Sequence, residues 1–215
     1  MLELPIEHST VLECYDQVAD ILGTGFFEGT KVSEKSGIGL YSLWPQWNGD
    51  LCWISAGNES AVDFFQGCFD RLQIAKRTQE LLGDHGELMM YSGFFVVRSE
   101  SHETYYHVDY SKEVGLNAMT LMTPVFETGE SGNLLYHDTD SVEQTHRYQT
   151  GRAVCFGGDF YHSTEPFKSD KQYVFLCFTF GVRDINKWDS IAETVTGQGL
   201  FYCHPVNGLT RTEDS

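Results

Sequence analysis

The feature that most constrains the fold is a series of short strand-like segments that fills about a hundred residues after Gly83, with no helical pattern among them. The segments are rich in β-branched and aromatic residues, and glycine, proline, asparagine and aspartate separate them. Many short strands without crossover helices are typical of an antiparallel double-sheet jelly roll or barrel. The expected strands are residues 87–97, 105–109, 116–126, 133–137, 143–148, 152–156, 160–162 and 172–180.

The first 83 residues follow a different pattern. Apolar residues recur at helical spacing over 8–22 and over 59–82, and a glycine follows each segment. Between these helices, 37–43 and 50–56 flank a turn that contains proline and Asn-Gly, which predicts a hairpin. Because a helix with one apolar face buries it against a neighbouring layer, we expect the helices to pack on the outside of one sheet. A further helix is expected over 186–195.

The length of 215 residues suits one hydrophobic core. We therefore expect a single α+β, mainly β domain over 1–215. It would comprise N-terminal helices and a hairpin over 1–83, a double-stranded β-helix (jelly-roll) core over 84–182, and a C-terminal tail over 183–215.

The charge balance restricts the partners. Aspartate and glutamate number 31 against 14 lysines and arginines, which gives a formal net charge of -17. Such a surface repels phosphate backbones and anionic lipids, so we expect neither nucleic-acid nor membrane partners, and a cationic substrate is slightly favoured. Acidity that serves only solubility is an equally good interpretation.

Six cysteines are scattered without C-x-x-C spacing, so no zinc site or disulfide framework is indicated, and we expect reduced thiols. The N-terminus lacks the basic and apolar segments of a signal peptide, and no apolar run is long enough to span a bilayer. These observations predict a cytoplasmic protein.

Two His-x-acid pairs are present, His85 with Glu87 and His107 with Asp109, where this composition yields about one by chance. His85 lies in a glycine-containing turn. His107 lies in an expected strand, where residues two apart project to one face and can converge on one ion. His162, which follows a distant expected strand, is the best candidate for a third ligand. Two histidines and one carboxylate are the residue types of the facial triad that binds non-heme iron(II). In the competing interpretation these histidines are ordinary core or capping residues.

Lys171 lies nine positions after His162, at the start of the last expected strand. Strand alternation puts Lys171, Tyr173 and Phe175 on one face. If that face lines the barrel, the ammonium group lies in an aromatic cavity, which is unfavourable unless an anion pairs with it. A dicarboxylic acid would supply that anion. In the alternative, Lys171 belongs to a solvated turn.

Together, His107-x-Asp109, the distal His162, the segment 151–156 that leads to it and the basic Lys171 resemble the iron(II)- and 2-oxoglutarate-dependent dioxygenases, and most closely their prolyl-hydroxylase-like branch. The resemblance covers about residues 87–182. It implies that His107, Asp109 and His162 bind Fe(II), that Lys171 pairs with the distal carboxylate of 2-oxoglutarate, and that O2 is the oxidant.

The chain departs from the family pattern at one position of the co-substrate pocket. The tyrosine that often precedes the first histidine is absent, and Val97 and Arg98 stand there. The candidates to complete the co-substrate pocket are Tyr91, Arg98 and Tyr173, and the candidates to contact substrate are Tyr105, His102 and Trp53.

As the resemblance implies, the protein would hydroxylate or oxidatively demethylate a small molecule, an amino acid or a peptide, and release succinate and CO2. Asp109 is a carboxylate and not the small residue of the halogenases, so chlorination is disfavoured. Two alternatives remain. One is a cupin-like metal enzyme that uses His137 or His146, and the other is a non-catalytic jelly-roll binding module. Both alternatives predict that Lys171 is dispensable.

Overall fold

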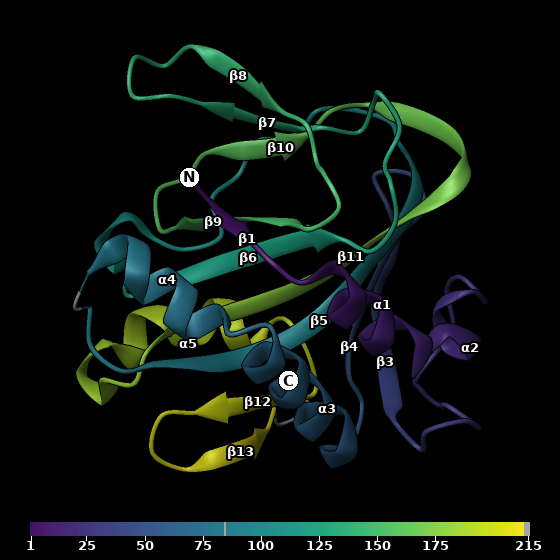
Figure 1. The fold of residues 1–215 in the computed structure, drawn as a ribbon, viewed down its shortest axis with the longest axis horizontal. Coiled ribbons are helices and arrows are strands. Elements are labelled where there is room, and N and C mark those ends of the chain that lie inside the picture. The colour runs from purple at the N-terminus through teal and green to yellow at the C-terminus, as the bar shows by residue number, and fades with distance from the viewer. Residues whose placement is uncertain (84, 213–215) are drawn as a thin grey trace.

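Two β-sheets face each other in the computed structural model, which describes residues 1–83 and 85–212, and only the backbone of 44–47 (Figure 1). The large sheet has the order β1-β9-β6-β11-β5-β4-β3-β2, the facing sheet the order β10-β7-β8, and β12 and β13 form a separate hairpin. All pairings are antiparallel. The strands are β1 (Leu2–Pro5), β2 (Thr30–Val32), β3 (Gly39–Trp47), β4 (Leu51–Ala56), β5 (Leu88–Ser101), β6 (Ala118–Pro124), β7 (Leu134–His137), β8 (Glu143–His146), β9 (Arg152–Gly157), β10 (His162–Thr164), β11 (Phe167–Val182), β12 (Phe201–His204) and β13 (Gly208–Arg211).

Each of the two predicted N-terminal helices is divided in two. At Gln73 the backbone leaves the helical region, with φ 55°, and separates α3 from α4. The side chain of Asn58 accepts a hydrogen bond from the backbone N–H of Ala61 and begins α3. The helices are α1 (His8–Asp16), α2 (Ala19–Leu22), α3 (Glu59–Arg71), α4 (Ile74–Leu82) and α5 (Trp188–Thr196), with 3-10 turns at Lys112–Val114 and Ile185–Lys187.

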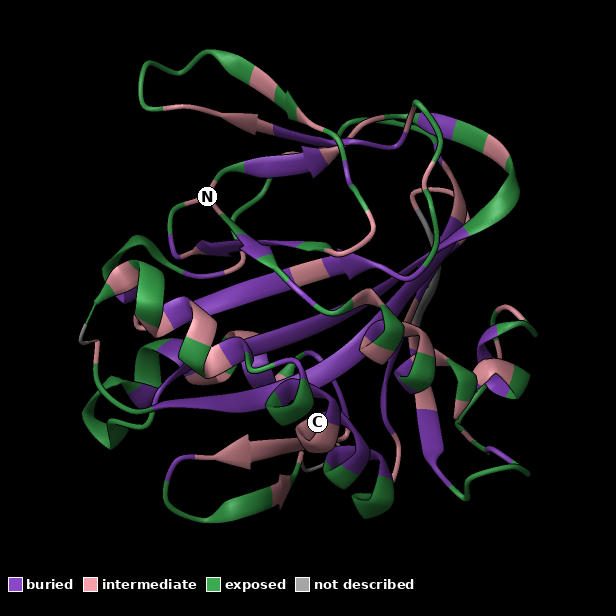
Figure 2. Ribbon diagram, viewed as in Figure 1, coloured by how far each residue is buried: buried purple, intermediate pink, exposed green. Residues whose placement is uncertain are grey.

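Strand alternation gives the large sheet two apolar faces. On β5, Phe95 and Val97 pack in the cluster shared with α1 to α4, whereas Phe94 and Val96 point into the space between the two sheets. The central strands are accordingly buried on both sides, while the outer surfaces of the helices are exposed (Figure 2). The predicted architecture is therefore confirmed: a mainly β jelly roll with its N-terminal helices outside one sheet.

Two cysteines differ from the sequence prediction. Cys14 of α1 and Cys68 of α3 form a disulfide, so the expectation that all thiols are reduced is wrong for this pair. The two helices pack side by side on the sheet and bring the Cα atoms to 6.4 Å, which lies within the range that a disulfide spans. Separately, no helix in 1–83 and 85–212 is long and apolar enough to cross a membrane.

The longest strand, β11, loses register with β5 near its start. Pairing passes from Lys168 with Glu100 directly to Tyr173 with Arg98, so 169–172 bulge out of the ladder. The carboxylate of Asp50, from the turn between β3 and β4, binds the backbone of β5 at this position. It accepts hydrogen bonds from the backbone N–H groups of Ser99 at 2.8 Å and Glu100 at 2.9 Å, and from the Ser99 hydroxyl at 2.6 Å.

Replacing Asp50 by alanine is expected to lower the free energy of unfolding by about 2 kcal/mol, because these hydrogen bonds to a charged acceptor are lost. Burial raises the pKa of Asp50, but the hydrogen bonds from Ser99 and Glu100 outweigh it and the pKa is lowered on balance. Because the folded-state pKa is depressed, this stabilisation is present above the unfolded-state pKa of about 3.9 and is lost as the pH falls through the folded-state value.

Urea denaturation at pH 7 and at pH 3 measures this effect. The difference between the native protein and the Asp50→Ala variant is expected to be smaller at pH 3. A change below about 0.5 kcal/mol at pH 7 would mean that Asp50 is an ordinary surface residue.

Candidate metal centre and its cavity

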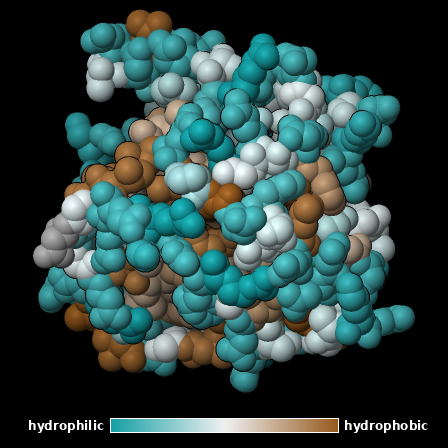
Figure 3. Space-filling view, in the orientation of Figure 1, coloured by the Kyte–Doolittle hydropathy of each residue, from teal (hydrophilic) through white to brown (hydrophobic). Residues whose placement is uncertain are grey.

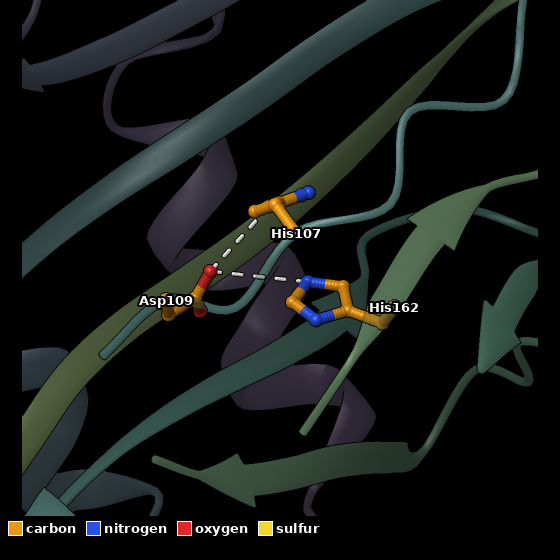
Figure 4. Close-up of side chains that lie close together, drawn as sticks. All are labelled: His107, Asp109 and His162. Atoms are coloured by element: carbon orange, nitrogen blue, oxygen red, sulfur yellow. Dashed lines mark ion pairs between the residues drawn. The ribbon is translucent and has the colours of Figure 1, made fainter. Parts of the chain in front are cut away.

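Three side chains meet between the two sheets, His107, Asp109 and His162 (Figure 4). The Oδ1 atom of Asp109 lies 3.6 Å from Nε2 of His107 and 3.8 Å from Nε2 of His162. One ligand atom from each residue lies within 4.8 Å of the other two, so the group could hold a metal ion. Ligand atoms about 2.1 Å from one ion are at most about 4.2 Å apart, and both distances to Asp109 satisfy this limit.

Both imidazoles are oriented by their own backbone. Nδ1 of His107 donates to the carbonyl oxygen of Tyr105 at 3.1 Å, and Nδ1 of His162 donates to that of Phe160 at 2.9 Å. A carbonyl oxygen only accepts, so the proton of each neutral ring lies on Nδ1 and the lone pair of Nε2 faces Asp109. This is the arrangement in which histidine binds a metal.

The carboxylate of Asp109 is also held in place. The Thr120 hydroxyl on β6 donates to Oδ2 at 2.5 Å, which leaves Oδ1 facing the histidines. The Thr194 hydroxyl on α5 donates to the backbone oxygen of Asp109 at 2.6 Å. Two distant elements therefore position this one residue.

A short backbone pairing brings the two histidines together. Residues 105–109 do not form the strand expected from the sequence, but His107 makes an isolated antiparallel bridge with His162 at the start of β10. The His107 N–H donates to the His162 oxygen at 2.9 Å, and the His162 N–H donates to the His107 oxygen at 3.0 Å. The Tyr105 N–H adds a bond to the Ser163 hydroxyl at 2.8 Å.

The electrostatic environment keeps His162 in its metal-binding form. Burial lowers the pKa of His162, His107 lowers it further, and Asp109 opposes both. A neutral imidazole is therefore favoured near pH 7, and only a neutral ring offers the lone pair that a metal requires.

The three residues lie in the wall of a cavity of about 460 Å3 between the sheets. Figure 3 shows hydrophobic side chains gathered over the region of β1 and β9, the first two strands at one edge of the large sheet, on a face that is otherwise mainly hydrophilic. The described lining residues are Leu51, Trp53, Phe94, Val96, Arg98, Tyr105, His107, Asp109, Thr120, Met122, Leu134, Tyr148, Phe156, His162 and Thr164.

Arg98 supplies the cation of this cavity. It projects from the inner face of β5 and is only 6% exposed. Its guanidinium donates to the Thr164 hydroxyl at 3.1 Å and to the Asn48 carbonyl at 3.3 Å, while its Nε has no partner in the part of the chain that the structure describes. Burial lowers the pKa of Arg98, while Asp50 and Tyr148 raise it. No carboxylate among the described residues lies within 4 Å of Arg98 to pair with it. A buried cation in this state is an anion-binding group.

Lys171 is not in the cavity, so the prediction that its ammonium group lies inside an aromatic pocket is wrong. The residue is exposed in the bulge of β11, where its N–H bonds to the Ser169 hydroxyl. Strand alternation holds only from Tyr173 onward, because 169–172 have no partners in β5.

The other predicted residues divide into two groups. Trp53 and Tyr105 line the cavity, as expected for substrate contacts. Tyr173, Tyr91 and His102 do not appear in its described wall: the Tyr173 hydroxyl accepts from the Gly129 N–H, the Tyr91 hydroxyl donates to the Val182 carbonyl, and His102 pairs with Glu100 on the surface. Their polar atoms are thus engaged elsewhere.

Three residues of the wall were not predicted from the sequence, namely Thr120, Thr164 and Tyr148. Thr120 and Thr164 lie in β6 and β10, and strand alternation turns both side chains toward the cavity. Tyr148 lies in the segment between β8 and β9, and no sequence pattern predicts which way its side chain points.

The histidines of the cupin-like alternative lie apart from the triad. His146 faces Glu3 at 3.4 Å beside β1, and its pKa is lowered by burial while Glu3 raises it. The His137 ring packs against those of Tyr106 and Tyr161, which also stack on each other. Neither residue belongs to the group that could hold a metal.

Comparison with known proteins gives matches only at the level of structure. No protein-family model and no curated protein sequence matches this chain. The non-heme alpha-ketoglutarate-dependent epimerase SnoN from nogalamycin biosynthesis is similar with a TM-score of 0.59 and 13% identity, over 85% of this chain and 78% of that chain. A prolyl hydroxylase from Trichoplax adhaerens, in complex with a hypoxia-inducible factor peptide, gives 0.54 and 14% identity, over 80% and 78%. A prolyl-4-hydroxylase from Pseudomonas putida gives 0.50 and 18% identity, over 85% and 92%.

These matches extend over more of the chain than residues 87–182, which carried the sequence resemblance. The chain therefore has the double-stranded β-helix fold of the iron(II)- and 2-oxoglutarate-dependent oxygenases, including the prolyl hydroxylases.

Proposed function

We propose that this protein is an iron(II)- and 2-oxoglutarate-dependent oxygenase. One observation carries the proposal: a His-Asp-His group with two properly oriented imidazoles shares a cavity with a buried guanidinium that has no carboxylate partner among the described residues. A metal-binding triad alone is compatible with many functions, and so is a buried arginine. Their combination suits a dianion that chelates a metal at one end, because the triad would hold the metal and the guanidinium would pair with the carboxylate at the other end.

In this proposal Nε2 of His107, Oδ1 of Asp109 and Nε2 of His162 bind Fe(II), and the remaining coordination positions are left for 2-oxoglutarate and O2. When bound, iron and 2-oxoglutarate supply the activation of O2, with release of succinate and CO2. The protein contributes fixed ligand positions, an apolar cavity that excludes water and the orientation of the substrate.

Arg98 takes the role that the sequence suggested for Lys171. Its guanidinium would pair with the distal carboxylate of 2-oxoglutarate, and its unpartnered Nε–H offers a donor for that purpose. The bond to Thr164, two residues after His162 on β10, ties the guanidinium to the strand that carries a metal ligand. One molecule can therefore reach from the triad to Arg98.

The reaction we propose is hydroxylation or oxidative demethylation of a small molecule, an amino acid or a peptide. Support for this range comes from proteins of the same fold, which include an epimerase of nogalamycin biosynthesis and prolyl hydroxylases, one of them with a bound peptide. Asp109 leaves no vacancy for a halide in the triad, which favours oxygen insertion over chlorination.

Anaerobic titration with Fe(II) and 2-oxoglutarate tests the proposed function. A weak visible charge-transfer band is expected only when both are added to the native protein, and the band is expected to be absent from the His107→Ala variant. If the native protein develops no band while it binds Fe(II), the metal centre does not serve 2-oxoglutarate chemistry.

Thr120 is expected to contribute to metal affinity through Asp109. The Thr120→Val change keeps the shape of the side chain but removes the hydrogen bond to Oδ2, so the affinity for Fe(II) or Ni(II) is expected to fall by about 10-fold to 100-fold. The Thr120→Ser variant keeps the hydroxyl and is expected to bind metal like the native protein. Calorimetric titration with Ni(II) measures both.

Thr123→Val is the matched control, because Thr123 lies on the same strand and its hydroxyl bonds to the Arg152 carbonyl at 3.0 Å, away from the triad. Equal metal affinity for Thr120→Val and the native protein would show that Thr120 does not position Asp109.

A further inference from the structure

The part of the cavity that remains for a substrate has no charged side chain in its described wall. Four charged or metal-binding residues line the cavity, namely Arg98, His107, Asp109 and His162, and all four are occupied if the proposed function holds. The two threonine hydroxyls are engaged as well, that of Thr120 with Asp109 and that of Thr164 with Arg98. The remaining wall is formed by aromatic and aliphatic side chains.

Trp53 provides a flat aromatic surface, fixed in position, in this wall. Its indole stacks on the ring of Phe94, with centroids 3.8 Å apart and planes inclined by 17°. Its Nε1–H donates to the backbone oxygen of Gln198 at 3.1 Å, so the polar atom of the indole is bound to the C-terminal segment and is not available to a ligand. The indole ring of Trp53 therefore offers apolar contact.

Tyr105 provides a second ring on the metal side of the cavity. Its ring centroid lies 5.8 Å from that of His107, and the residue is 53% exposed although it lines the cavity. Its backbone is fixed by the bond from its N–H to Ser163. Tyr105 therefore lies where the cavity meets solvent.

We infer that the substrate presents an uncharged aromatic ring to the part of this cavity that Trp53 and Tyr105 line. The inference rests on the proposed function, because it assumes that 2-oxoglutarate occupies Arg98. A charged group here would lose its hydration without an ion partner. A cation would meet ring faces, but it would also lie near Arg98, and the only carboxylate of the described wall is the metal ligand Asp109. The cationic preference suggested by the net charge does not extend to this wall.

Three naphthalene probes of similar shape test the inference: 2-naphthol, 2-(aminomethyl)naphthalene and 2-naphthoate. Their binding is measured by calorimetry, first with protein free of metal and 2-oxoglutarate, then with protein loaded with Ni(II) and 2-oxoglutarate. We expect 2-naphthol to bind in both states, and in the loaded state at least about tenfold more tightly than either charged probe.

Two variants locate the binding site. Tyr105→Ala, at an exposed position that does not endanger the fold, is expected to weaken 2-naphthol binding about tenfold, and so is Trp53→Leu. Tyr161→Ala is the matched control, because this tyrosine is 46% exposed but is not in the described wall of the cavity. If Trp53→Leu does not fold, Tyr105→Ala decides.

The outcomes separate the inference from the function on which it rests. Binding of the aminomethyl probe as tight as that of 2-naphthol, no binding of 2-naphthol, or unchanged binding in Tyr105→Ala would overturn the inference. Binding of 2-naphthoate to the unloaded protein, and its displacement by 2-oxoglutarate, reports on Arg98 and therefore on the proposed function. If 2-oxoglutarate fails to displace 2-naphthoate while 2-naphthol behaves as expected, the proposed co-substrate is wrong but the aromatic site stands.

Discussion

Replacing Arg98 by methionine is expected to weaken the binding of 2-oxoglutarate by at least about 100-fold, because a buried charge-assisted pair is worth several kcal/mol when one partner is removed. Methionine suits the site because it fills much of the same space without a charge. The buried position of the guanidinium, 6% exposed and with an unpartnered Nε, is the physical reason to expect so large an effect.

Calorimetric titration of 2-oxoglutarate into Ni(II)-loaded protein measures this effect. Lys171→Met is the matched control, since Lys171 is exposed in the β11 bulge and is expected to leave the affinity unchanged. Arg98→Lys keeps the charge but not the planar fork of donors, so it is expected to lie between the two. Loss of affinity in Lys171→Met with full affinity in Arg98→Met would restore the lysine as the anchor.

Replacing His162 by alanine is expected to lower the affinity for Fe(II) or Ni(II) by at least about 100-fold. Loss of a hydrogen bond to a metal ligand alone costs about 10-fold to 100-fold in affinity, and this variant loses the ligand itself. His162 is the most buried of the three residues, with 8% of its side chain exposed, so solvent does not readily replace its Nε2. The same variant is expected to abolish the visible band with 2-oxoglutarate.

His146→Ala serves as the control for this prediction, because His146 pairs with Glu3 away from the triad. Metal affinity is measured anaerobically for Fe(II) and by calorimetry for Ni(II). If His162→Ala binds metal as the native protein does and His146→Ala does not, a cupin-like ligand set is the better description.

The large-scale architecture could be predicted from the sequence because its causes are local. Alternation on β5 and β11 sets two apolar faces, and glycine and proline separate the strands. A local pattern does not predict the break at Gln73. This residue has φ 55° and divides the predicted helix in two, although the apolar periodicity continues on both sides. A left-handed glutamine has no reliable sequence signal.

The convergence of His107 and Asp109 followed from strand geometry, although the segment of His107 is a single bridge and not a strand, and the structure places His162 beside them. Two-residue spacing needs only a locally extended backbone to aim both side chains at one point. The His-x-Asp pattern was therefore informative even where the strand prediction was inaccurate.

The position of the buried cation could not be predicted in the same way. Lys171, nine positions after His162, shares a face with Tyr173 only if the strand alternates without interruption, and the bulge at 169–172 breaks that alternation. At the same position of β5, the backbone N–H groups of Ser99 and Glu100 donate to Asp50, from the turn between β3 and β4. Contacts between such distant residues are not visible in a local pattern. The buried cation that the structure places in the cavity wall is Arg98 and not Lys171.

The most direct test is a crystal structure of the protein with Ni(II) and 2-oxoglutarate. We expect anomalous density for one metal about 2.1 Å from Nε2 of His107, Nε2 of His162 and Oδ1 of Asp109. We also expect the distal carboxylate of 2-oxoglutarate to lie about 2.9 Å from the Arg98 guanidinium. A metal bound elsewhere, or a 2-oxoglutarate whose distal carboxylate turns away from Arg98, would contradict the proposal.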